Sequence, residues 1–347
     1  MRTESDRGRT RPGGIKLAAT VVVGTVLVLF GGATSPGTAS SATPQIGTAS
    51  SMTQMSGPDS SGSDSPGSDS SGAESSGEAL GEPSSQDLAY GPLPQQKLDI
   101  YLSEAPIRRG TIIYIHGGGF TTGDKNEISD TSSDLILSQR QNGFDVVSVN
   151  YRLASEAPYP AAFDDTSLAV SWVRGHGAEH GLHNERVIVV GHSAGGALAA
   201  MIGTRAGDAT RFGTVPDVDG WVGVAAILDF NATGHMARDF AGDWGIEGAV
   251  ERFVASPLTN LDPSDPPGFL IHGDHDNVVS VTQSDIFTIA AAANGSDVTY
   301  NRVDFDPQGR PASECLWHSP LCAANSAQFE AWLLDRSGSP TSRSGRV

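Results

Sequence analysis

Ser193 stands at the centre of the segment Gly-His-Ser-Ala-Gly, residues 191–195. In a chain with 42 glycines among 347 residues, the pattern G-x-S-x-G alone is weak support for a reactive serine. Its surroundings are more specific, because the run VIVV precedes it and the run ALAAMIG follows it. A nucleophilic serine needs this strand–turn–helix order, which lifts its hydroxyl clear of the sheet. The alternative interpretation is a serine that only caps the following helix.

A second segment, HGGGF at residues 116–120, follows another run of β-branched residues. Successive glycines let backbone N–H groups point into a cavity, where they could stabilise the negatively charged oxygen of a tetrahedral intermediate. We predict that the N–H groups of Gly118, Gly119 and Ala194 form this oxyanion hole. A phosphate-binding loop is disfavoured, because no Lys-Ser/Thr pair follows the glycines.

A nucleophilic serine also requires a histidine and an acid. The segment GDHDNVV begins at residue 273, after a predicted strand, and offers Asp274 and Asp276 as candidate acids. His318 is the single histidine in the sequence after these residues. The chain order Ser–Asp–His is the order that α/β hydrolases use. The sequence therefore predicts a triad of Ser193, His318 and one of the two aspartates.

Strands and helices alternate along the part of the sequence that must position these residues. Runs rich in β-branched and aromatic residues predict strands at 97–102, 111–116, 144–150, 186–190, 221–228 and 268–272. Helical stretches are expected at 130–140, 161–174, 194–205, 281–293 and 323–334. This alternation predicts one domain at residues 87–336, with a mostly parallel, doubly wound α/β sheet and a nucleophile elbow.

The regions outside this domain have a different composition. A basic start followed by an apolar run predicts a signal peptide or an N-terminal membrane anchor at residues 1–33. The cleaved signal is favoured, because the run is short for a membrane span. Residues 34–86 are rich in Ser, Gly and acids and predict a disordered tether, and residues 337–347 predict a disordered tail. We expect an exported protein, secreted or held at the cell surface.

The two cysteines and the net charge bear on disulfide bonding and on the kinds of binding partner. Cys315 and Cys322 are the two cysteines of the chain, and in an exported protein one local disulfide around His318 is the default interpretation. A zinc pair is the alternative. The net charge of −18 argues against nucleic-acid partners.

Two groups of residues invite a metal interpretation. One contains His176, His180 and His183, and the other contains His272, Asp274, His275 and Asp276. We favour structural roles for both, because no step of the expected reaction needs a metal or another cofactor.

Residues from about 90 to 334 resemble the α/β-hydrolase carboxylesterases, the hormone-sensitive-lipase-like and bacterial acetyl- and feruloyl-esterase-like enzymes. The segments that carry the resemblance are LDIYL, HGGGFTTGDK, VVSVNYRLASEAPYPAAFDD, VVGHSAGGALAA, SPLTNLDPSDPPGFLIHGDHDNVV and the terminal histidine loop. The family pattern H-G-x-x-D-x-x-V implies that Asp276 is the acid, with Asp274 as the alternative. The resemblance of the segment VVSVNYRLASEAPYPAAFDD also implies that Tyr151 and Arg152 support the loops behind the active site.

The resemblance implies an α/β-hydrolase fold and a serine carboxylesterase that acts on small-molecule or polymer-borne esters. Family members often have a glycine before the catalytic histidine, where this chain has Trp317. Residues 231–253 are the one candidate lid, so little or no cap is expected, and with it a preference for short or exposed acyl groups. An amide-cleaving hydrolase with the same triad is the near alternative, and a non-catalytic binding module is the distant one.

Overall fold

The computed structural model describes residues 82–129, 134–233, 240, 246–304, 318–322 and 325–335. All of these residues belong to one compact unit, residues 73–347. The predicted signal segment and tail, and nearly all of the predicted tether, lie outside the described residues. The first strand begins at Ser85, two residues before the predicted domain boundary at residue 87. None of the described helices is both long and apolar enough to cross a membrane.

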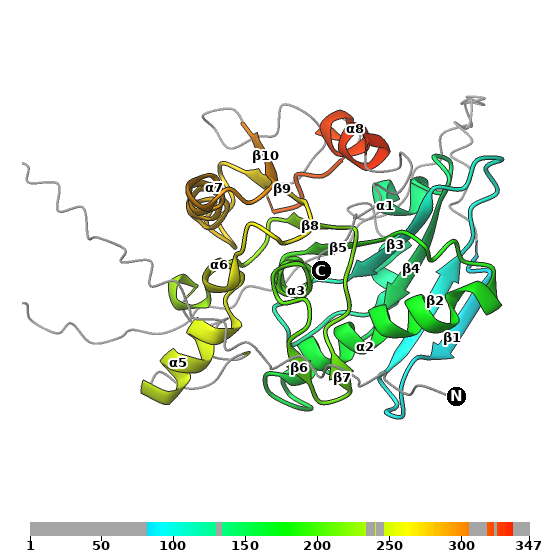
Figure 1. Ribbon diagram of the computed structural model, residues 1–347, viewed down its shortest axis with the longest axis horizontal. Helices are drawn as coiled ribbons and strands as arrows, with labels where there is room; N and C mark the ends of the chain where they lie inside the picture. The colour runs from blue at the N-terminus through cyan, green and yellow to red at the C-terminus, as the bar shows by residue number, and fades with distance from the viewer. Residues whose placement is uncertain are drawn as a thin grey trace, which may run out of the picture. The chain divides into compact units, whose positions relative to one another are not determined.

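Eight strands form one sheet in the order β1-β2-β4-β3-β5-β8-β9-β10. The six strands β4, β3, β5, β8, β9 and β10 run parallel to one another. At one edge of the sheet, β2 is antiparallel to β4 and β1 is antiparallel to β2. The predicted mostly parallel α/β sheet is therefore confirmed (Figure 1). The strands are Ser85–Ala89 (β1), Lys97–Tyr101 (β2), Gly110–Ile115 (β3), Phe144–Val149 (β4), Val187–His192 (β5), Gly220–Val224 (β8), Gly268–Gly273 (β9) and Val298–Val303 (β10).

The edge strands are the ones that the sequence patterns miss. Every residue of the central strands β3 and β9 is buried, which produces the apolar runs that predicted them. β1 and β10 lie at the two edges and carry mostly half-buried or exposed residues. Polar edge strands lack the hydrophobic pattern that makes a buried strand readable. β8 ends at Val224, four residues before the predicted end at residue 228, because the next residue, Ala225, has a positive φ that an extended strand does not allow.

Helices cover both faces of the sheet, as Figure 1 shows. α1 (Asp134–Ser138) and α8 (Ala327–Asp335) lie over one face, and their apolar residues join a core with Ile112, Val190 and Ile271. The other face carries three predicted helices, which are Ala161–His176 (α2), Ala194–Thr204 (α3) and Thr282–Asn294 (α7).

Shorter elements fill the connections between these helices and strands. The sequence patterns did not predict α5 and α6 or the small hairpin of β6 and β7. The bounds are Ile246–Ala255 (α5), Pro257–Asn260 (α6), Ala209–Thr210 (β6), Gly213–Thr214 (β7), Lys125–Ser129 (η1), Gly177–His180 (η2) and Phe230–Ala232 (η3). The candidate lid at residues 231–253 contains part of η3 and of α5, and 234–239 and 241–245 lie outside the described residues.

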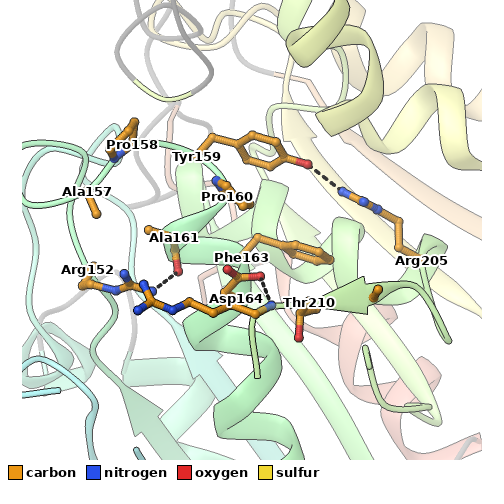
Figure 2. A pocket seen from close by; sticks show the side chains of 12 residues that line it. Arg152, Ala157, Pro158, Tyr159, Pro160, Ala161, Phe163, Asp164, Arg205 and Thr210 are labelled. Carbon is orange, nitrogen blue, oxygen red and sulfur yellow. Dashed lines mark hydrogen bonds between the residues drawn. The ribbon is translucent and has the colours of Figure 1, made fainter. Parts of the chain in front are cut away.

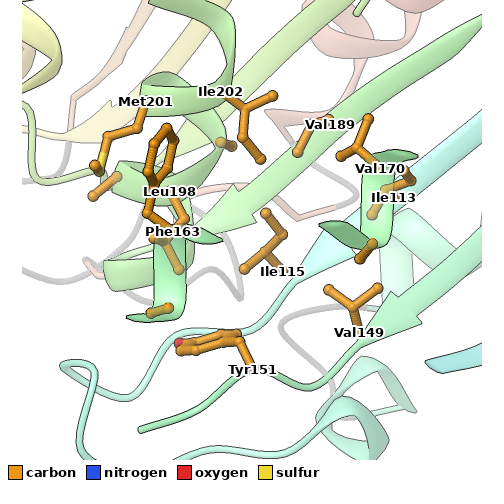
Figure 3. Packing of buried hydrophobic residues seen from close by; sticks show 14 of the residues in the cluster. Ile113, Ile115, Val149, Tyr151, Phe163, Val170, Val189, Leu198, Met201 and Ile202 are labelled. Atoms are coloured by element: carbon orange, nitrogen blue, oxygen red, sulfur yellow. The ribbon is translucent and has the colours of Figure 1, made fainter. Parts of the chain in front are cut away.

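The helix that follows Ser193 is fixed by the core. All eleven residues of α3 are buried, and Leu198 and Met201 meet Phe163 and Val189 in one cluster (Figure 3). Burying a side chain of this size contributes about 1.5–3 kcal/mol. α3 therefore cannot shift without disturbing the core, and the start of this helix is a rigid support for the site.

The crossing of β5 and α3 leaves no room for side chains at its glycines. A Cβ on Gly195 would lie 2.1 Å from the carbonyl oxygen of Ile115. We expect Gly195→Ala to lower the free energy of unfolding by about 2–3 kcal/mol, because the backbone must move to admit the methyl group. Gly175→Ala is the matched control, since nothing lies within 4 Å of its Cβ position in α2, and it should be neutral or stabilising. Denaturant unfolding of both variants checks this, and equal stabilities would contradict it.

Candidate active site

Ser193 lies on a strained turn between β5 and α3. Its backbone angles are φ 54° and ψ −116°, a conformation that residues with a side chain rarely adopt. The turn is held by the hydrogen bond from the Ser193 N–H to the carbonyl oxygen of Val224, 2.8 Å long. This is the geometry of a nucleophile elbow, and the side chain of Ser193 makes no cap hydrogen bond to the helix.

The structure brings the three predicted triad residues together. The Nε2 of His318 lies 2.9 Å from the Oγ of Ser193, and its Nδ1 lies 2.7 Å from the Oδ2 of Asp276. Because the carboxylate can only accept, His318 carries its proton on Nδ1, and its Nε2 accepts from the hydroxyl of Ser193. The arrangement leaves Nε2 able to take the hydroxyl proton when the oxygen attacks an electrophile.

Asp276, rather than Asp274, is the carboxylate that contacts His318. Its Oδ1 accepts the backbone N–H groups of Val278 and Val279, at 2.8 and 2.9 Å. Asp274 instead pairs with the neighbouring His275, 2.7 Å away. The loop after β9 therefore turns only one of its two aspartates towards the serine.

A second histidine supports Asp276 from inside the protein. His272 is fully buried, and its Nε2 lies 2.9 Å from the carbonyl oxygen of Val279 and 3.2 Å from the Oδ2 of Asp276. Because both of these neighbours are acceptors, the ring proton lies on Nε2, and Nδ1 accepts from the hydroxyl of Ser284 at 2.8 Å. Burial of Asp276 opposes its charge, but the hydrogen bonds from His272 and His318 outweigh it and hold the pKa of Asp276 well below its ordinary value.

The low pKa of Asp276 makes stability depend on pH in one direction. Above about pH 5 the charged carboxylate of Asp276 contributes its full share to the free energy of unfolding. This contribution is lost as the pH falls from the pKa of about 3.9 that a carboxyl has in the unfolded chain towards the lower pKa that Asp276 has in the folded protein. We expect the free energy of unfolding to fall less steeply with acidification in Asp276→Asn than in the native chain. Urea unfolding at a series of pH values measures this. Parallel curves for the two proteins would contradict it.

The predicted oxyanion loop is shaped by its glycines. Gly118 and Gly119 have φ of 98° and 61°, and a Cβ on Gly118 would lie 2.1 Å from the carbonyl oxygen of Thr122. The Gly118 carbonyl oxygen accepts the N–H groups of Thr121 and Thr122, both at 3.1 Å. Within the described part of the chain, the N–H groups of Gly118, Gly119 and Ala194 donate to no protein acceptor, so they remain available to a ligand.

Tyr151 contacts this loop, and the adjacent Arg152 contacts helix α2. The hydroxyl of Tyr151 donates to the carbonyl oxygens of His116 and Gly117, and its ring stacks on His116 at 4.4 Å. Arg152 pairs with Asp165 through two hydrogen bonds, 2.8 Å from Nε and 2.7 Å from Nη2. These contacts fix the start of α2 and the glycine loop relative to one another.

The remaining predicted residues lie apart from this cluster or outside the described residues. His183 faces Asp145 at 3.4 Å, while His176 and His180 lie beside the ring of Trp172. Among the residues that the structure describes, no group of three His, Cys, Asp or Glu side chains is arranged to hold a metal ion. Cys315 and Trp317 lie outside the described residues, so the disulfide and the effect of Trp317 stay predictions.

A cavity of about 500 Å³ lies near the start of α2 (Figure 2). Tyr159 and Arg205 meet across it through a hydrogen bond of 2.9 Å. Its lining consists of Arg152, Ala157, Pro158, Tyr159, Pro160, Ala161, Phe163, Asp164, Arg205, Ala209, Thr210 and Arg211. None of the triad residues lines it.

The strand order, the serine elbow and the placing of His318 and Asp276 after later strands define an α/β hydrolase. The chain belongs to the BD-FAE family, whose model matches residues 98–290, more than half of the sequence. The resemblance read from the sequence motifs is therefore confirmed.

Individual relatives are esterases by name. Esterase LipI of Mycobacterium tuberculosis is 45% identical over 108 residues, which are 30% of this chain and 31% of LipI. Esterase LipC of the same organism is 28% identical over 214 residues, 57% of this chain and 52% of LipC. The chain thus spans about half or less of these curated relatives.

Solved structures extend the likeness in fold. A truncated form of a carbohydrate esterase from gut microbiota has a TM-score of 0.64 at 22% identity, over 75% of this chain and 98% of that one. An acetyl ester-xyloside bifunctional hydrolase from Caldicellulosiruptor lactoaceticus has a TM-score of 0.54 at 24% identity, over 70% and 85%. At these identities the likeness concerns the fold alone.

Proposed function

We propose that the protein is a serine carboxylesterase that hydrolyses esters through an acyl-enzyme intermediate. The observation that carries the proposal is the hydrogen-bonded series Ser193–His318–Asp276, in which Ser193 directly follows β5. The esterase names of the relatives support the ester over other electrophiles.

The proposed reaction has two halves. In the first, Ser193 Oγ attacks the ester carbonyl while His318 Nε2 takes its proton, and the N–H groups of Gly118, Gly119 and Ala194 stabilise the oxyanion. His318 then gives this proton to the leaving alcohol, which breaks the ester bond and leaves an acyl-serine. In the second half, His318 takes a proton from water while the water oxygen attacks the acyl carbon. His318 then returns this proton to Ser193 Oγ, which breaks the acyl–serine bond and releases the carboxylic acid. Asp276 orients His318 and stabilises its charged form throughout.

The sequence offers one short candidate lid, residues 231–253, and this supports an open site. We expect short acyl groups, or acyl groups exposed on a larger molecule, as substrates. A series of p-nitrophenyl esters from acetate to palmitate tests this, and kcat/KM should peak at the short end. A peak at long chains would contradict the short-chain preference. Higher activity on an aryl formamide than on the matching acetate ester would instead favour the amide-cleaving alternative.

The proposal includes export from the cell, secreted or anchored at the surface. The basic and apolar N-terminal pattern and the polar stretch after it support this. Fractionation of cells that express the full chain, with sequencing of the mature N-terminus, distinguishes a cleaved signal from a retained anchor. Recovery of the uncleaved chain in the cytoplasm would contradict export.

We also propose the disulfide between Cys315 and Cys322, which would restrain the loop that carries His318. Changing both cysteines to serine should lower the free energy of unfolding by about 2 kcal/mol, because the closed loop limits the unfolded chain. Peptide mapping without reductant detects the bond directly. Free thiols at both positions in exported protein would contradict the pairing.

A further inference from the structure

His192 lies between two parts of the site that come from distant segments of the chain. It ends β5 and immediately precedes Ser193. Its Nε2 lies 2.6 Å from the backbone carbonyl oxygen of His318 and 3.4 Å from the hydroxyl of Ser319. A Cβ on Gly117, at the root of the oxyanion loop, would lie 3.0 Å from its Nδ1. The side chain of His192 therefore contacts the loop of His318 and lies next to Gly117, and it belongs to the strand that precedes Ser193.

The protonation of His192 suits this contact. Burial, with a smaller contribution from the neighbouring His318, lowers the pKa of His192 to about 4, so the ring is neutral near neutral pH. A carbonyl oxygen can only accept, which places the single ring proton on Nε2. His192 therefore donates a hydrogen bond to the main chain of the residue whose side chain serves Ser193.

The support beneath this hydrogen bond is rigid. β5 lies in the middle of the sheet, and His192 pairs with Val224 of the adjacent strand β8. The rings of His192 and His318 also pack at 4.9 Å. Because His192 and Ser193 are consecutive, movement of the strand end carries the serine and the anchor of His318 together. The hydrogen bond from His192 to the His318 carbonyl oxygen therefore links the position of the His318 ring to that of the Ser193 hydroxyl.

We propose that His192 is a positioning residue. By fixing the backbone of His318, it sets the distance from the Nε2 of His318 to the Oγ of Ser193. The inference rests on the triad proposed above and adds a residue that touches no reacting atom. A misplacement of about 1 Å between reacting groups can cost about a hundredfold in rate. Loss of this hydrogen bond should therefore lower catalysis far more than it lowers substrate binding.

The test compares His192→Phe, which keeps a ring but removes the donor, with His192→Gln, whose amide can place a donor at nearly the same reach. On p-nitrophenyl acetate, kcat of the Phe variant should fall about ten- to a hundredfold with little change in KM. The Gln variant should recover most of kcat. If the Phe variant does not fold, His192→Met replaces it as a flexible side chain without a donor.

A second readout separates positioning from a loss of folding. The downfield proton NMR signal of the His318–Asp276 hydrogen bond should be present in the native and Gln proteins and lost in the Phe variant, at matched melting temperatures. Equal kcat in the Phe and Gln variants, or an unchanged downfield signal in the Phe variant, would overturn the role of His192. Such a result would leave the triad intact, whereas full activity in Ser193→Ala would overturn the proposed function itself.

Discussion

Replacing Ser193 by alanine is expected to lower kcat on p-nitrophenyl acetate roughly ten-thousandfold or more. The hydroxyl lies 2.9 Å from His318 Nε2, and its oxygen is the atom that would form the acyl intermediate, so the variant lacks the nucleophile. The residual rate would come from substrate binding and the oxyanion donors alone. Steady-state kinetics with the purified variant measures the loss.

Stability is the control for this variant. Ser193 makes no cap hydrogen bond to α3, and alanine keeps its Cβ, so the fold should survive the change. The melting temperature should match that of the native chain within a few degrees. A variant that keeps its fold and full esterase activity would contradict the assignment of the nucleophile.

Changing Asp276 to asparagine is expected to lower kcat about a thousandfold to ten-thousandfold. An amide at this position can donate to His318 Nδ1, and the ring would then present a proton, rather than a lone pair, to Ser193. The loss of negative charge also removes the stabilisation of protonated His318 during the reaction. Kinetics at saturating substrate isolate kcat from any change in binding.

Asp274→Asn is the matched control for Asp276→Asn. The two aspartates stand two residues apart after β9, but the carboxylate of Asp274 contacts His275 and not His318. We therefore expect nearly native kcat in Asp274→Asn. Similar losses in both variants would mean that the loop as a whole, and not the hydrogen bond to His318, determines activity.

The sequence predicted the central parallel strands because burial on both faces leaves an apolar run in each of them. It also predicted Ser193, since the residue types on either side of it belong to a strand and a helix. The choice of Asp276 over Asp274 came from the family resemblance. In the structure, the backbone N–H groups of Val278 and Val279 explain it by turning one carboxylate inwards.

Other features of the site had no readable signal. His192 occupies the variable position of G-x-S-x-G, and its contact with His318 joins residues 126 positions apart. In the sequence, His272 is one member of a histidine–aspartate group, and its support of Asp276 follows from its buried contacts with Ser284, Val279 and Asp276. Contacts of this kind depend on tertiary packing, which local residue patterns do not encode.

Covalent labelling with a fluorophosphonate probe tests whether Ser193 is the nucleophile, because the probe reacts selectively with a serine that has been activated as a nucleophile. We predict one adduct per native chain, located on Ser193 by peptide mass spectrometry, and no adduct on the folded Ser193→Ala variant. Labelling at another residue, or the absence of any adduct on the native, folded chain, would contradict it.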